Sequence, residues 1–126
     1  MKKFAFIGLG VMGYPMAGHL AKAGYAVSVF NRSNEKAQAW KKEYQGHIAL
    51  TPKEAAINSD IVFICVGNDD DVRDVVLGEH GALAGMTPET ILVDHTTASA
   101  ELARELNQYC IQKQVGFIDA PVSGGQ

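Results

Sequence analysis

Apolar and polar positions along the chain follow two periods, one typical of strands and one typical of helices. Short apolar runs predict strands at residues 4–7, 26–30, 47–50, 61–66, 90–94 and 117–119. Helical spacing and capping residues predict helices over 12–23 and 33–44, from 52, around 72–76, and from 99 to about 116. Strands alternating with helices build a parallel sheet covered on both faces. The sequence therefore predicts one α/β domain over residues 1–126, with a doubly wound, mostly parallel sheet.

Three polar residues mark where helices begin. Ser33 and Ser99 are N-cap candidates, and Thr51 combines with Pro52 and Glu54 in a capping box with proline at the first helical position. Residues 67–71 are predicted to form a polar loop, and residues 78–85 a loop or a brief helical turn. These signals place polar loops at the ends of the predicted strands.

The first strand runs directly into three glycines, Gly8, Gly10 and Gly13, in the spacing G-x-G-x-x-G. Gly8 permits the tight turn, Gly10 has no side chain to block a pyrophosphate, and Gly13 lets the next helix pack close to the strand. The free N–H groups and positive dipole end of that helix favour phosphate. This order of strand, turn and helix predicts a dinucleotide-binding domain of the Rossmann type. The alternative is a purely structural strand–helix turn.

Composition and charge narrow the classes of partner. The net charge of −3 gives no basic footprint for nucleic acid, and no apolar run is long enough to cross a bilayer. Cys65 and Cys110 lie far apart, without the spacing of a disulfide framework or a zinc site. We therefore expect a cytoplasmic protein that binds a small molecule and interacts with neither nucleic acid nor membrane.

The residues after the second strand bear on the cofactor. An NAD-binding domain usually has an acid here, which accepts hydrogen bonds from the ribose hydroxyls. This chain has Asn31 and Arg32 instead, followed by Ser33 at a helix start. A guanidinium pairs well with a 2′-phosphate. We expect NADP(H) to be preferred, with NAD(H) as the second cofactor; the alternative is that Arg32 is a solvated surface charge.

Acidic and histidine side chains give no predicted metal site. Asp69, Asp70 and Asp71 are adjacent, but their position favours solvated residues at a helix N-terminus. The histidines lack the spacing of metal ligands. His95 is a tempting general base because it lies in a loop near the predicted site, but we assign it no catalytic role.

The segment from Phe6 to Leu20 resembles the N-terminal signature of the β-hydroxyacid dehydrogenases, which include 3-hydroxyisobutyrate dehydrogenase, tartronate semialdehyde reductase and succinic semialdehyde reductases. Many Rossmann proteins share the glycines, but few share Met12 followed by Pro15-Met16-Ala17. The resemblance extends to the last residues and covers less than half of a typical family member. Asp94-His95-Thr96-Thr97 is similar to the family's D-x-S-T segment, although Ala100 stands where a proline is common.

The resemblance, together with the glycine turn and the strand ends, implies a set of cofactor-binding residues. These are Gly8, Leu9, Gly10, Val11, Met12, Gly13, Asn31, Arg32, Ser33, Val66, Gly67, Asn68 and Thr97. The segment from Asp119 to Gly125 resembles the family's substrate-binding segment. By that match Ser123, Gly124 and Gly125 bind the carboxylate of the substrate; taken alone, they would read as a flexible tail.

The family's catalytic lysine lies in a helix after this segment, so the resemblance implies no catalytic residue within this chain. It also implies an all-α C-terminal domain beyond residue 126, through which the full-length protein forms a homo-oligomer. We therefore expect the cofactor domain of a dehydrogenase acting on a small 3-hydroxy acid or its semialdehyde, inactive by itself. The alternatives are a stand-alone, non-catalytic dinucleotide-binding module and a domain of a 6-phosphogluconate dehydrogenase-type enzyme.

Overall fold

The computed structural model, which describes residues 2–122, is built around a six-stranded sheet in the order β3-β2-β1-β4-β5-β6. Every neighbouring pair of these strands is parallel. The strands are β1 (Lys3–Ile7), β2 (Ala26–Phe30), β3 (His47–Ile48), β4 (Ile61–Ile64), β5 (Ile91–Asp94) and β6 (Gly116–Asp119). The chain order reverses between β1 and β4, which is the switch point where ligands bind in sheets of this kind.

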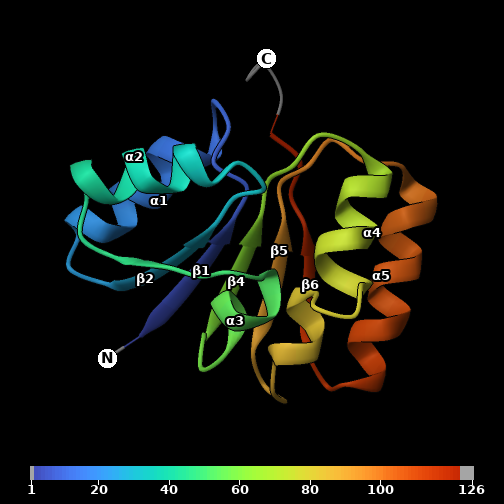
Figure 1. Cartoon of the computed structure of the whole chain (residues 1–126). Helices are drawn as coiled ribbons and strands as arrows, with labels where there is room; N and C mark the ends of the chain where they lie inside the picture. Colours follow the sequence, from blue (N-terminus) through green and yellow to red (C-terminus); the bar gives the residue numbers. More distant parts are fainter. Residues whose placement is uncertain (1, 123–126) are drawn as a thin grey trace.

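Helices cover both faces of the sheet. They are α1 (Gly13–Lys22), α2 (Asn34–Glu43), α3 (Pro52–Ala56), α4 (Asp69–Leu77), α5 (Ala100–Gln112) and the 3₁₀ turn η1 (Ala82–Gly85). Helices α1 and α2 gather beside β1 and β2, whereas α4 and α5 lie together at the other end of the sheet (Figure 1). This is the doubly wound α/β architecture that the sequence predicts, and the predicted fold class is confirmed.

Alternation along β1 divides the core between the two faces. Ala5 and Ile7 pack in the larger cluster with side chains of α3, α4, η1 and α5. Phe6 points the opposite way, into a smaller cluster with α1 and α2 that includes the fully buried Trp40. Because both faces of the central strands are buried, the end of β1 is fixed from both sides, and with it the turn that follows.

Several boundaries differ from the sequence prediction. Strand β4 ends at Ile64 rather than at residue 66, because the N–H of Val66 donates to the Thr96 side chain instead of continuing the ladder. Helix α4 begins at Asp69, so residues 69–71 are its first turn and not a loop. Strand β3 is two residues long and leaves Leu50 exposed. Helix α5 ends at Gln112, four residues before Gly116.

The predicted caps are confirmed in part. Thr51 and Ser99 accept hydrogen bonds from the backbone N–H groups of Glu54 and Leu102, each at 3.0 Å. Ser33 occupies the N-cap position of α2, but its side chain makes no capping bond. Over residues 2–122, no helix has the length and apolar character needed to span a membrane.

Candidate functional site

The turn after β1 is held in one conformation by close backbone packing. Gly8 has φ +102°, and an added Cβ would collide with the backbone carbonyl oxygen of Cys65. The N–H of Gly8 donates to the carbonyl of Phe30 at 2.9 Å, which ties the turn to the end of β2. An added Cβ on Gly13 would collide with the carbonyl oxygen of Gly8. The first turn of α1 therefore lies directly against the loop, as the glycine spacing predicts.

Asn31 braces the same turn from the neighbouring strand. Its side-chain oxygen accepts from the N–H of Leu9 at 2.8 Å, and its side-chain nitrogen donates to the carbonyl of Ser33 at 3.1 Å. The Leu9 side chain is buried in the smaller core cluster. Asn31 thus links the end of β2 to the glycine turn and fixes the direction in which the turn leaves the sheet.

The middle of the turn presents unused donors to open space. An added Cβ on Gly10 would meet no heavy atom within 4 Å. Over residues 2–122, the N–H groups of Gly10, Val11 and Met12 donate to no other group of the chain. Free N–H groups ahead of a helix N-terminus are suited to an anion, because the helix dipole adds to their partial charge.

These donors open into a cavity of about 470 Å³ across the carboxyl ends of β1, β2, β4 and β5. A volume of this size is typical of a small-molecule site. The lining residues are Ile7, Gly8, Leu9, Gly10, Val11, Met12, Phe30, Asn31, Arg32, Lys36, Cys65, Val66, Gly67, Asp71, Val75, His95, Thr96, Thr97 and Val122.

Three of the residues expected to bind cofactor do not line this cavity. Gly13 packs against Gly8, as described above. Ser33 lies at a separate shallow hollow beside α2. Asn68 caps α4, accepting from the N–H of Asp71 at 2.9 Å. The carboxylate-binding residues implied by the family resemblance, Ser123 to Gly125, lie outside the described residues.

A buried acid joins two of the cavity loops. Asp94 is 2% exposed, and its carboxylate accepts from the N–H of Thr96 at 2.9 Å. Thr96 in turn accepts from the N–H of Val66 at 3.1 Å through its hydroxyl. Burial raises the pKa of Asp94, although the bonds from Thr96 oppose this shift. The hydrogen bonds that join Asp94 to Thr96 and Thr96 to Val66 hold the loops after β4 and β5 together at the cavity wall.

His95 connects the cavity to the segment after β6. Its Nδ1 lies 2.8 Å from the carbonyl oxygen of Ala120, and its ring stacks on Phe63 with the centroids 5.8 Å apart. Its own backbone carbonyl accepts from the N–H of Val122 at 3.1 Å. Through these two contacts His95 holds Ala120 and Val122, which belong to the segment that the family resemblance links to substrate.

Basic and acidic side chains meet at the β2 side of the cavity. Arg32 and Lys36 both line it, and Arg32 Nη2 lies 2.9 Å from an oxygen of Asp71. Sequence reasoning missed Lys36 and Asp71. Lys36 lies in the first turn of α2, whereas Arg32 precedes that helix, so no helical spacing links the two in the sequence. Asp71 comes from α4, 39 residues after Arg32, and no local pattern links the two.

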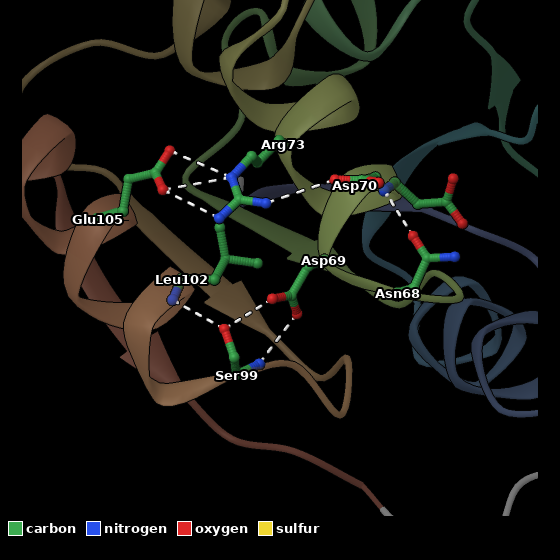
Figure 2. Close-up of polar contacts among 8 residues, drawn as sticks. Asn68, Asp69, Asp70, Arg73, Ser99, Leu102 and Glu105 are labelled. Carbon is green, nitrogen blue, oxygen red and sulfur yellow. Dashed lines mark hydrogen bonds and ion pairs between the residues drawn. The ribbon is translucent and has the colours of Figure 1, made fainter.

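Two of the three adjacent acids of α4 do not line the cavity: Asp69 points toward α5, and Asp70 points toward Arg73 of its own helix (Figure 2). Asp69 accepts from the hydroxyl and the N–H of Ser99 at 2.6 and 2.9 Å, and these bonds lower its pKa. Asp70 faces Arg73 at 3.5 Å, and Arg73 also pairs with Glu105 at 3.2 Å. The three acids thus serve three different partners and form no common cluster. The bonds of Asp69 to Ser99 and of Arg73 to Glu105 link α4 to α5 and so help to fix the position of Asp71, whereas the Asp70–Arg73 pair lies within α4.

Comparisons with known proteins agree with this geometry. The family model described as the NAD binding domain of 6-phosphogluconate dehydrogenase matches residues 3–126. An uncharacterised oxidoreductase of Shewanella frigidimarina is 62% identical over 126 residues, which are 100% of this chain and 43% of that protein.

Two solved structures have a similar fold. The Mycobacterium tuberculosis 3-hydroxyisobutyrate dehydrogenase, solved with L-serine, has a TM-score of 0.88 at 31% identity, covering 99% of this chain and 42% of its own. An imine reductase from Myxococcus stipitatus, in complex with NADP⁺, has a TM-score of 0.85 at 25% identity, with coverages of 98% and 42%. The chain therefore spans less than half the length of these relatives.

Proposed function

Because this chain belongs to the family of NAD-binding domains found in 6-phosphogluconate dehydrogenase and 3-hydroxyisobutyrate dehydrogenase, we propose that it is the cofactor domain of an NADP(H)-dependent β-hydroxyacid dehydrogenase. The observation that carries the cofactor preference is the β2 end of the cavity. Two cations, Arg32 and Lys36, line it there, and Asn31 stands where an NAD site has an acid. A 2′-phosphate fits two cations far better than a ribose hydroxyl does. The imine reductase relative was solved with NADP⁺, which supports the same preference.

Residues at the ends of different strands would bind different parts of the cofactor. The N–H groups of Gly10, Val11 and Met12 would bind the pyrophosphate, while Arg32 and Lys36 would bind the 2′-phosphate. Val66, Gly67 and Thr97 would line the remainder, held by the bonds that join Asp94, Thr96 and Val66. When bound, NADP(H) supplies or accepts the hydride that is exchanged with a carbon of the substrate.

The substrate that we propose is a small 3-hydroxy acid or its semialdehyde. The support is the resemblance of the segment leading to Ser123, Gly124 and Gly125, whose hydroxyl and N–H groups would bind a carboxylate. His95 contributes by holding residues 120 and 122 beside the cavity. On the same resemblance, we propose that the acid–base group is a lysine, located in the segment of the family members' chains that residues 1–126 do not cover.

Replacing Arg32 with alanine tests the proposed cofactor. We expect the wild type to bind NADPH more tightly than NADH. Arg32→Ala should weaken the binding of NADPH about tenfold and change the binding of NADH little. A charge-assisted hydrogen bond contributes about 1.5–3 kcal/mol, and solvent screens the exposed Arg32 side chain, so the lower end of this range applies. Fluorescence titration with each reduced cofactor measures both affinities. The difference should shrink as the salt concentration rises.

Lys41→Ala is the matched control, because Lys41 is an exposed cation of the same helix, α2, that carries Lys36 and does not line the cavity. It should leave both affinities unchanged. If the wild type binds the two cofactors equally, or Arg32→Ala weakens both equally, Arg32 is a surface charge and the NADP(H) assignment is wrong.

A further inference from the structure

Arg32 and Asp71 form an ion pair within the lining of the cavity. Arg32 follows β2 and Asp71 belongs to the first turn of α4, and their charged atoms lie 2.9 Å apart. Both side chains line the cavity. The Arg32 side chain is 73% exposed and that of Asp71 is 28% exposed, so the carboxylate is the more enclosed partner. The guanidinium of Arg32, which the proposed function assigns to a 2′-phosphate, is therefore already paired with a negative charge.

The position of Asp71 is fixed by its surroundings. Its backbone N–H donates to the Asn68 side chain, which caps α4. Asp71 Oδ2, the oxygen that does not face Arg32, lies 3.0 Å from the position that a Cβ on Gly67 would take. The carboxylate fits here because Gly67 has no side chain. Asp69 and Asp70 are engaged by Ser99 and Arg73 instead. Of these three acids, Asp71 alone lines the cavity.

We propose that Asp71 is a specificity-determining residue that lowers the preference of this site for NADP(H) over NAD(H). The inference rests on the proposed function. A 2′-phosphate carries nearly two negative charges, so it must take Arg32 from the carboxylate and then remain close to that carboxylate. Both effects weaken the binding of NADP(H).

The same carboxylate suits NAD(H). Ribose hydroxyls donate hydrogen bonds, and sites for NAD(H) commonly provide a carboxylate to accept them. The end of β2 provides none, since Asn31 and Arg32 stand there. Asp71 brings one to the same corner of the cavity from α4. With NAD(H) bound, the Arg32–Asp71 pair need not break, so the carboxylate carries no penalty for that cofactor.

The test is Asp71→Asn, which keeps the side chain's shape and removes its charge. We expect the Kd of NADPH to fall about two- to fivefold, the range given by the free energy of an exposed ion pair, because Arg32 no longer has a competing partner. The Kd of NADH should stay unchanged or rise. The ratio of the two affinities then shifts toward NADPH, and the shift should diminish as salt is added.

Asp70→Asn is the matched control. It removes the same charge from the same first turn of α4, but the Asp70 side chain is 95% exposed and faces Arg73 rather than the cavity. It should leave the affinity ratio at the wild-type value. An unchanged or lowered preference for NADPH in Asp71→Asn, or an equal shift in both variants, would overturn the inference.

The variant Arg32→Ala separates this inference from the proposed function. If Arg32→Ala reduces NADPH affinity while Asp71→Asn does not increase it, the cofactor assignment stands and the role of Asp71 is wrong. If the wild type binds neither cofactor, both are wrong. In the Arg32→Ala background, Asp71→Asn should improve NADPH affinity less than it does in the wild type, because the competition for the guanidinium is gone.

Discussion

Replacing Gly10 with alanine is expected to reduce the affinity for NADPH and NADH alike, while the protein folds normally. No positive φ is required at Gly10, and an added methyl group would meet no heavy atom within 4 Å, so the folded chain accommodates it. The methyl group would instead occupy the space in front of the free N–H groups of the turn. Overpacking of this kind costs about 1–3 kcal/mol, which corresponds to roughly five- to 150-fold in affinity.

Calorimetric titration of Gly10→Ala measures this loss, with circular dichroism to verify the fold. Gly116→Ala is a suitable control, since its methyl group would make ordinary contacts of 3.5 Å or more at the start of β6, away from the cavity. Unchanged affinity in Gly10→Ala would exclude the pyrophosphate from this turn.

Gly8→Ala should behave in the opposite way, by destabilising the fold itself. Gly8 has φ +102°, and its added Cβ would collide with the carbonyl oxygen of Cys65 in the backbone that follows β4. Backbone strain costs about 1–3 kcal/mol and overpacking a similar amount, so we expect a loss of about 2–6 kcal/mol in the free energy of unfolding. Thermal or urea unfolding of the wild type and the two glycine variants would measure it.

The contrast between the two variants is the informative part of this experiment. Gly10→Ala should keep the wild-type melting temperature and bind the cofactor more weakly. Gly8→Ala should instead lower the melting temperature of the protein without cofactor. A melting temperature for Gly8→Ala equal to that of the wild type would mean that the turn can relax away from Cys65, and that it is not held between the ends of β2 and β4 as described.

The sequence predicts the fold well because its signals are local. Each strand is a short apolar run, and the glycine turn, Thr51 and Ser99 mark their elements through their nearest neighbours. The errors arise where a distant residue decides. Strand β4 ends early because the N–H of Val66 bonds to Thr96, 30 residues away. The start of α4 at Asp69 did have a local signal, three acids at a helix N-terminus, and what the sequence analysis did not use was Asn68 as the cap before them.

The candidate site divides in the same way. Leu9, Arg32 and Thr97 follow strands directly, and the ends of parallel strands meet at one edge, so their presence in the cavity follows from strand order. Lys36 and Asp71 lie on helices, and whether a helical side chain faces the cavity depends on how that helix packs. The pairing of Arg32 with Asp71 joins β2 to α4 across the switch point, and only the three-dimensional arrangement brings it about.

The central claim is that a dinucleotide binds across the carboxyl ends of β1, β2, β4 and β5. Its most direct test is to titrate ¹⁵N-labelled protein with NADP⁺ and map the amide resonances that shift. The account predicts the largest shifts at Gly10, Val11 and Met12, at Arg32 and Lys36, and at Thr97. Shifts confined to the hollow beside α2, around Asn34 and Gln38, or no shifts at all, would contradict it.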